Sequence, residues 1–207
     1  MTTHRYDGHV HLVGNGLSGS GCWLRLDGLW HRALGEVMRR TIGLEAKATA
    51  RDFDESFVGH LAGLVAASSM DKALLLAQDE VYDDDGRKMD FGSFYVPNAY
   101  LFKVCGRHPE FVPAVSIHPG RKDALEELER CLAGGARALK LLPNCQNVNC
   151  ALPQYDEFWR RMAASGLPFL CHTGGEMTVP VISRAYQDPR ILRRPLELGI
   201  KVIAAHA

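Results

Sequence analysis

The sequence has no excess of charge of either sign, no apolar run long enough to cross a membrane and no targeting segment. In 207 residues, Lys and Arg together number 24 and Asp and Glu together number 24. Without a positive field, the chain is not expected to bind nucleic acid or an anionic membrane surface. No apolar stretch approaches the roughly 20 residues that span a bilayer, and residues 1–12 lack the pattern of a signal peptide. These absences predict a cytoplasmic protein.

The cysteines lack the close CxxC spacing of zinc sites and redox motifs. There are six of them, spread along the chain. In a cytosolic protein such cysteines are expected to be free thiols, several of them buried. The sequence therefore predicts neither disulfides nor a cysteine-ligated zinc; the residues concerned are Cys22, Cys105, Cys131, Cys145, Cys150 and Cys171.

Internal repeats and low-complexity tracts are also missing, but one alternation of segment types recurs along the chain. Short apolar runs alternate with amphipathic segments, which is typical of a parallel α/β fold. Strands are expected at 7–11, 72–78, 111–117, 136–142, 167–171 and 200–205, and helices at 29–44, 52–68, 98–107, 123–133, 154–165 and, broken by two prolines, 179–198.

The chain is expected to form one domain, 1–207, with a long insertion at residues 14–50 after the first strand. The part from Gly14 to Gly28 is rich in glycine, which predicts a loop. We interpret the insertion as a mobile lid that carries Trp23, Trp30 or Arg25 to a substrate. The alternative is an ordered surface insertion.

Histidines collect directly after the predicted strands. Five of the nine histidines lie there, and the fourth strand contributes a lysine in the same position. Functional side chains of parallel α/β folds gather at the carboxyl ends of the strands. The sequence therefore predicts a single site built from His9, His11, His118, Lys140, His172 and His206.

The pair His9 and His11 is the sharpest of these signals. Residues two apart on a strand point to the same face, so both imidazoles project together. Two neutral imidazoles on a rigid strand can bind a divalent metal, with His172 from another strand as a third ligand. Zinc favours nitrogen ligands, although Mn, Co or Fe could use the same set.

Each of these residues also has a plainer interpretation. An HxH pair occurs by chance in ordinary strands. A single histidine after a strand, such as His118, is often a structural residue, Lys140 could simply extend its amine to solvent, and His206 could have no role. Only the joint placement of the residues favours a site.

At this point the chain resembles the amidohydrolase superfamily. Within it, the closest similarity is to the amidohydrolase-related branch that includes aminocarboxymuconate-semialdehyde decarboxylase and related hydrolases and decarboxylases. The resemblance spans nearly the whole chain except the insertion. The motifs that carry it are Asp7-Gly8-His9-Val10-His11, residues 97–98 and 107–110, Val115-Ser116-Ile117-His118-Pro119, residues 138–143 with Gln146, residues 166–168 with His172-Thr173-Gly174, and Val202-Ile203-Ala204-Ala205-His206.

The resemblance implies a TIM-type (β/α) barrel with a divalent metal, zinc in first place, at its carboxyl-end mouth. It implies that His9, His11 and His172 are metal ligands, and that His206 orients or polarises the attacking water or the substrate. Lys140 stands where some superfamily members have a carboxylated lysine that bridges two metals. In this branch a substrate-facing or structural role is expected instead, and His118, Trp23 and Arg25 are expected to line the substrate site.

The resemblance also implies a strand-eight aspartate that this chain does not contain. We therefore expect an incomplete barrel with about six of its eight strands, either truncated or completed by another chain or a second copy. Three functions stay open: hydrolysis of a C–N or C–O bond, non-oxidative decarboxylation of an aromatic or unsaturated acid, and an inactive fragment. The expected partner is a small-molecule substrate, and a homo-oligomer is left open.

Overall fold

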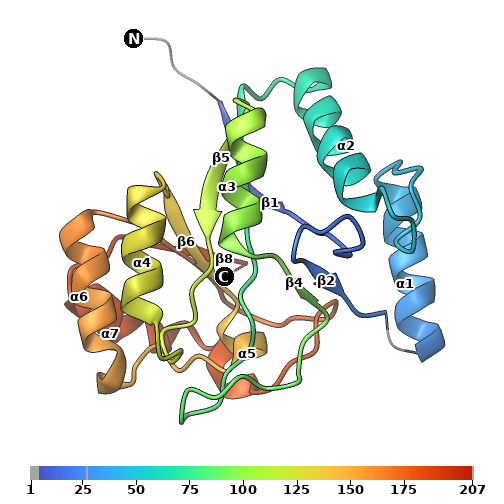
Figure 1. Cartoon of the computed structure of the whole chain (residues 1–207). Helices are drawn as coiled ribbons and strands as arrows, with labels where there is room; N and C mark the ends of the chain where they lie inside the picture. Colours follow the sequence, from blue (N-terminus) through green and yellow to red (C-terminus); the bar gives the residue numbers. More distant parts are fainter. Residues whose placement is uncertain (1–4, 27, 207) are drawn as a thin grey trace. The chain divides into compact units, whose positions relative to one another are not determined.

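The computed structural model describes residues 5–26 and 28–206 and has an α/β fold of the TIM-barrel type (Figure 1). Six parallel strands form the larger sheet of the described part, in the order β1-β3-β5-β6-β7-β8. Two further strands form a separate antiparallel ribbon. The parallel strands are β1 (Tyr6–His11), β3 (Lys72–Leu76), β5 (Phe111–Val115), β6 (Ala138–Leu141), β7 (Phe169–His172) and β8 (Val202–Ala205).

The chain divides into two compact units. Unit 1 comprises Met1–Leu76 and Ser93–Val112, and unit 2 comprises Ala77–Gly92 and Pro113–Ala207. In unit 1, β1 pairs in parallel with β3. The other elements of unit 1 are the ribbon of β2 (Trp23–Leu24) with β4 (Phe94–Tyr95), and the helices α1 (Gly28–Thr41), α2 (Phe53–Ala67) and α3 (Asn98–Arg107).

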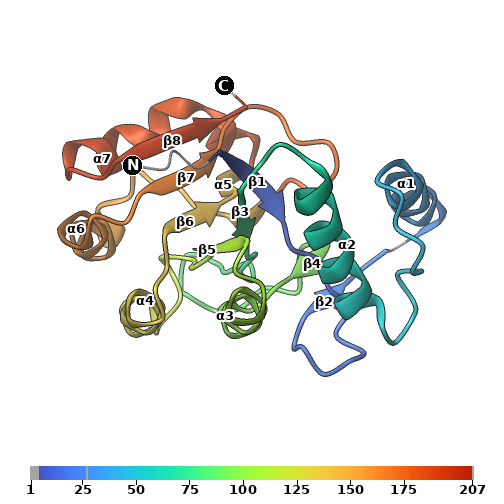
Figure 2. The same ribbon diagram turned by 90° about the horizontal axis from the view of Figure 1, so that it is seen from above.

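Unit 2 contains successive parallel strands joined by helical crossovers. All four residues of β6 and of β7 are buried, as is usual for a parallel sheet whose faces are both covered. Helices α4 and α6 lie side by side against these strands (Figure 2). The helical elements of this unit are α4 (Ala124–Ala133), α5 (Pro143–Gln146), α6 (Asp156–Ser165), α7 (Arg193–Glu197) and the short 3₁₀ helices 153–155, 184–187 and 189–192.

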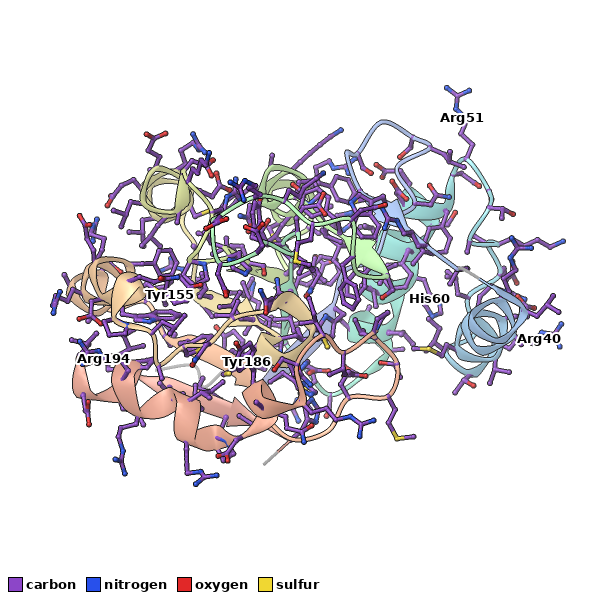
Figure 3. All side chains as sticks on the ribbon, turned by 90° about the horizontal axis from the view of Figure 1, so that it is seen from below. Arg40, Arg51, His60, Tyr155, Tyr186 and Arg194 are labelled. Atoms are coloured by element: carbon purple, nitrogen blue, oxygen red, sulfur yellow. The ribbon has the colours of Figure 1, made fainter. Side chains whose placement is uncertain are left out.

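An ion pair connects the last two helices of unit 2. Arg194 on α7, labelled in Figure 3, donates hydrogen bonds to both carboxylate oxygens of Asp156 at the start of α6. Arg160, one turn along α6, donates to the same carboxylate at 3.1 Å. The two guanidinium groups hold the pKa of Asp156 below its ordinary value, although burial opposes the shift. This contact holds α7, which lies between β7 and β8 in the chain, against α6.

The predicted alternation of strands and helices is confirmed, with differences at the boundaries. The helix predicted at 98–107 has those limits in the structure, whereas the five strands after the first are displaced or shortened at their ends. Lys140 lies inside β6, as it does in the strand predicted at 136–142. His172 is the last residue of β7 and not the first residue after it. The apolar residues at the ends of the predicted strands include coil residues. The side-chain pattern does not distinguish these from strand residues.

Two predicted segments differ more strongly from the structure. The broken helix expected at 179–198 is coil up to Ser183, followed by two 3₁₀ helices and the five-residue α7. In segment 14–50, the short helix expected at 29–44 is a helix of 14 residues, and β2 lies in the stretch that was predicted to be loop. Among the helices that the structure describes, none combines the length and apolar composition needed to span a membrane.

Candidate functional site

The two histidines of β1 converge on one point. His9 Nε2 and His11 Nε2 lie 3.2 Å apart, with ring centroids separated by 5.1 Å. The register of β1 against β3 shifts between Asp7 and Val10, which places one extra residue in β1. A bulge of this kind re-aims neighbouring side chains, and the Asp7 carboxylate stabilises it by accepting a hydrogen bond from His9 N at 3.0 Å.

The β2–β4 ribbon lies beside this pair within unit 1. The ring of Phe94 meets His11 edge-on at 6.1 Å between centroids. On the same ribbon, the rings of Trp23 and Tyr95 are 6.3 Å apart, and Arg25 Cζ lies 4.6 Å from the centre of the Trp23 ring. The predicted residues Trp23 and Arg25 therefore form one cation–π cluster, to which Tyr95 also belongs. Sequence reasoning missed Tyr95 and also Phe94, which contacts His11.

In unit 2, Lys140 and His172 project from the same face of the sheet. Lys140 pairs with Leu170 and His172 follows two residues later on β7, so the alternation of strand residues puts both side chains on one side. Lys140 is fully buried and His172 is 5% exposed. Among the residues that the structure describes, neither Lys140 Nζ nor His172 Nε2 has a hydrogen-bond partner.

Burial sets the protonation of both groups. It lowers the pKa of Lys140 to about 8, although Cys171, Glu176 and Cys145 act in the opposite direction. Burial, together with the positive charge of Lys140, also lowers the pKa of His172. A neutral imidazole is the form that binds a metal ion.

Glu176 is a residue of this site that sequence reasoning missed. It belongs to the glycine-containing loop after β7, and its Oε2 lies 3.8 Å from His172 Nε2. Burial raises the pKa of Glu176, but hydrogen bonds from the Thr178 hydroxyl and the backbone amides of Thr178 and Val179 outweigh it and hold the pKa below its ordinary value. Its place four residues after a strand-end histidine was the available signal.

His206 lies next to His172. The backbone pairing of His172 with Ala205 puts the following residue beside it, and the two ring centroids are 5.0 Å apart. His206 has a positive φ of 64°, which is uncommon outside glycine. Gly174 is required opposite it, because a Cβ at that position would lie 2.8 Å from the His206 carbonyl oxygen.

His118 is held by backbone groups on both ring nitrogens. Its Nε2 donates to the Gln146 carbonyl oxygen at 2.7 Å, and its Nδ1 accepts from Gly120 N at 3.0 Å. Burial lowers its pKa to about 4, so the ring is neutral near pH 7. The arrangement matches the structural interpretation of this histidine, and its contact with a substrate stays a prediction.

The structure thus brings the predicted residues together in two groups. His9, His11, Trp23 and Arg25 belong to unit 1, whereas His118, Lys140, His172 and His206 belong to unit 2. Within the residues that the structure describes, no set of three or more His, Cys, Asp or Glu side chains is arranged to hold a metal ion.

Each group nevertheless contains atoms that suit a divalent metal. Adjacent ligands at about 2.0–2.2 Å from a tetrahedral zinc ion lie roughly 3.4 Å from each other. The 3.2 Å between His9 Nε2 and His11 Nε2 is close to this spacing. A buried imidazole nitrogen without a hydrogen-bond partner, such as His172 Nε2, is costly unless a ligand occupies it.

An α/β fold of the TIM-barrel type with histidines at its strand ends defines a class of enzymes with a common architecture. The chain belongs to the amidohydrolase family, because the family model Amidohydro_2, described as amidohydrolase, matches residues 6–207. The six free cysteines agree with the prediction from their spacing. No curated protein is similar enough to match the chain.

Solved structures support the same fold at low sequence identity. A TIM-barrel protein, Bb4693, from Bordetella bronchiseptica is 17% identical with a TM-score of 0.63, over 98% of this chain and 66% of its own. A 2,6-dihydroxybenzoate decarboxylase in complex with 2,6-dihydroxybenzoate is 16% identical with a TM-score of 0.56, over 99% and 67%.

A third structure contains a metal. The 5-carboxyvanillate decarboxylase LigW2 from Novosphingobium aromaticivorans, solved with bound manganese, is 12% identical with a TM-score of 0.51, over 95% of this chain and 56% of its own. The chain therefore spans about two thirds or less of the length of these structures.

Proposed function

We propose that this protein is a divalent-metal-dependent hydrolase of the amidohydrolase-related branch that includes aminocarboxymuconate-semialdehyde decarboxylase. The substrate is a small molecule with a C–N or C–O bond to be cleaved. The observation that carries the proposal is the convergence of His9 Nε2 and His11 Nε2 at 3.2 Å. Membership of the amidohydrolase family supports it.

In this proposal His9, His11 and His172 hold the ion, with zinc the first candidate. The chemistry that such an ion supplies is an acidified water and polarisation of a carbonyl group. The bulged β1 fixes two imidazoles before the ion arrives, so little ordering is needed on binding. His206, beside His172, orients the attacking water or the substrate. Lys140 places a buried amine on the same face of the sheet to stabilise negative charge.

Metal content tests the proposal directly. The purified protein is expected to contain about one equivalent of zinc or manganese by elemental analysis, and a His9→Ala/His11→Ala double variant is expected to lose it. His60→Ala is the matched control. His60 lies on α2 of the same unit (Figure 3), where its Nε2 contacts the Ile42 carbonyl oxygen at 2.7 Å. A wild-type protein without metal, or a double variant that keeps it, would contradict the proposal.

Decarboxylation of an aromatic or unsaturated acid is a second candidate. The observation that favours it is the cluster of Trp23, Arg25 and Tyr95, since a guanidinium stacked on aromatic rings suits a planar carboxylate. Two of the similar structures are decarboxylases. Carbon dioxide release from dihydroxybenzoates, measured beside hydrolysis of amides and lactones, distinguishes the two reactions. Metal binding without either activity would favour the third possibility, an inactive fragment.

A further inference from the structure

We propose that Glu176 supplies a carboxylate ligand to the divalent ion bound by His172. The proposal rests on the metal-dependent function proposed above and adds a ligand from the loop after β7. Its basis is the pairing, in unit 2, of a buried imidazole with a largely buried carboxylate whose nearest atoms are too far apart for a hydrogen bond. His172 Nε2 and Glu176 Oε2 are 3.8 Å apart, and their side chains are 6% and 12% exposed.

The distance suits two ligands of one ion better than a direct contact. A charge-assisted hydrogen bond between a nitrogen and a carboxylate oxygen is about 2.7–2.9 Å long. Two ligands of the same tetrahedral ion are roughly 3.4 Å apart. The observed separation is close to the second value.

The loop fixes one carboxylate oxygen and directs the other towards His172. Oε1 of Glu176 accepts hydrogen bonds from Met177 N at 2.8 Å, Thr178 N at 2.5 Å, the Thr178 hydroxyl at 2.6 Å and Val179 N at 3.2 Å. Oε2 is the atom nearest to His172. Ligating carboxylates in metal sites are commonly oriented by such hydrogen bonds.

The imidazole also has an atom available for an ion. The backbone of Gly175 lies near the His172 ring and favours its protonated form. Among the described residues Nε2 has no hydrogen-bond partner, so its lone pair is available for an ion. A metal-binding histidine typically donates its other ring N–H to a backbone carbonyl or carboxylate.

The competing interpretation is that Glu176 only caps its own loop. That role accounts for the four hydrogen bonds on Oε1 but not for Oε2. A capping glutamate also needs no buried, unpartnered imidazole beside it, since an unsatisfied buried polar atom costs free energy. The two interpretations differ in what happens when the carboxylate becomes an amide.

The test is Co²⁺ binding to the full-length chain, comparing wild type with Glu176→Gln. The amide retains an oxygen that can accept the loop hydrogen bonds, but it removes the anionic ligand. We expect the Kd for Co²⁺ to rise about 100-fold or more, since loss of an outer-shell partner alone costs about 10–100-fold. The visible absorption bands of bound Co²⁺ are expected to change in position and intensity because the ligand set changes.

Thr178→Val is the matched control. It removes one of the four hydrogen bonds to Oε1 and keeps the carboxylate. It is therefore expected to retain the wild-type Co²⁺ spectrum, with a Kd raised about tenfold, the lower end of the range for an outer-shell partner. Thermal unfolding of each apo variant followed by circular dichroism verifies that it folds.

The outcomes separate this inference from the proposed function. Wild type and Glu176→Gln with the same Kd and the same Co²⁺ spectrum, combined with loss of binding in His172→Ala, would overturn the ligand role of Glu176 alone. A wild-type protein that does not bind Co²⁺ would overturn both.

Discussion

Asp54 organises the loop that follows the histidine strand. This fully buried carboxylate on α2 accepts hydrogen bonds from Asn15 N at 2.6 Å, from the Ser18 hydroxyl at 3.0 Å and from the Ser20 hydroxyl at 2.5 Å. A buried charge is stable only when hydrogen bonds replace its hydration. Asp54 therefore binds three residues of the loop that leads to the β2–β4 ribbon.

Asp54→Asn is expected to lower the free energy of unfolding by about 2–4 kcal/mol, because an amide group would face donors that it cannot all accept. Urea denaturation followed by circular dichroism measures the change. Asp52→Asn is the control, since Asp52 directly precedes α2 and its side chain makes no capping hydrogen bond; a change within about 0.5 kcal/mol is expected there. Equal effects at the two positions would contradict this account of Asp54.

Lys140, unlike Asp54, is a buried charged group whose amine has no hydrogen-bond partner within the described part of the chain. Its pKa of about 8 in the folded chain lies below the ordinary 10.5. Between these values the unfolded chain binds more protons than the folded one, so this residue makes stability rise with pH. Below about pH 8 both states are protonated, and the full cost of burying the charge is present.

Lys140→Met is therefore expected to stabilise the metal-free protein near pH 7, because it keeps the volume and removes the charge. The gain in free energy of unfolding should be constant below about pH 8 and shrink as the pH approaches 10.5. Urea denaturation of both proteins at several pH values, with a chelator present, gives the difference. A gain that does not depend on pH would show that the amine is not the cause.

Sequence reasoning can select the residues whose position follows from strand ends. His9, His11 and His172 could be selected because parallel strands point their carboxyl ends in one direction. Asp54 could not, because a helix brings it to its partners, and Glu176 was marked only by its place four residues after His172. Neither residue has a periodic position that marks it in the sequence.

The loop after β1 contains two glycines at which an added Cβ would have different surroundings. Gly16 and Gly19 both have positive φ angles, 77° and 86°. A Cβ on Gly16 would lie 2.0 Å from the Cys22 carbonyl oxygen, whereas nothing lies within 4 Å of one on Gly19. Gly16 is therefore required by both steric contact and backbone conformation, whereas Gly19 is required by backbone conformation alone.

Gly16→Ala is expected to destabilise the protein by about 3 kcal/mol or more, because a backbone carbonyl cannot move away at little cost. Gly19→Ala is expected to cost about 1–2 kcal/mol, the strain of a left-handed backbone with a side chain. Urea midpoints of the two variants and wild type measure both effects. If Gly19→Ala were as damaging as Gly16→Ala, the close approach to Cys22 would not be the reason for the glycine.

Elements were predictable where apolar residues repeat over several turns, as in α3 and α4. The ribbon of β2 and β4 was missed because two-residue strands contain no alternation to detect. The prediction of a broken helix at 179–198 was wrong, because Pro189 and Pro195 each fit only the first turn of a helix. Two short 3₁₀ helices and the five-residue α7 form in this segment instead.

The fold class follows from the alternation of elements, and the family match agrees with it over residues 6–207. The division into two compact units does not follow from the alternation, because the boundary crosses β5 at Val112 and Pro113. A boundary inside a strand leaves no linker composition for the sequence to reveal.

The free energy of unfolding of the whole molecule is expected to fall at acidic pH, and His118 is the residue with the clearest contribution. The pKa of about 4 in the folded state lies below the ordinary 6.5. Between these values the unfolded chain binds the additional proton, so stability falls as the pH is lowered from about 6.5 towards 4. For this one residue the loss is at most about 3 kcal/mol.

His118→Gln tests this source of acid sensitivity. Its amide can still donate to the Gln146 carbonyl oxygen but leaves Gly120 N without the ring acceptor, so the variant is expected to be about 1–3 kcal/mol less stable at pH 7. Because glutamine does not titrate, its free energy of unfolding should fall less steeply than that of wild type between pH 6.5 and 4. Urea denaturation at half-unit pH steps measures the two slopes. Parallel slopes would mean that other groups cause the acid unfolding and that folding does not lower the pKa of His118.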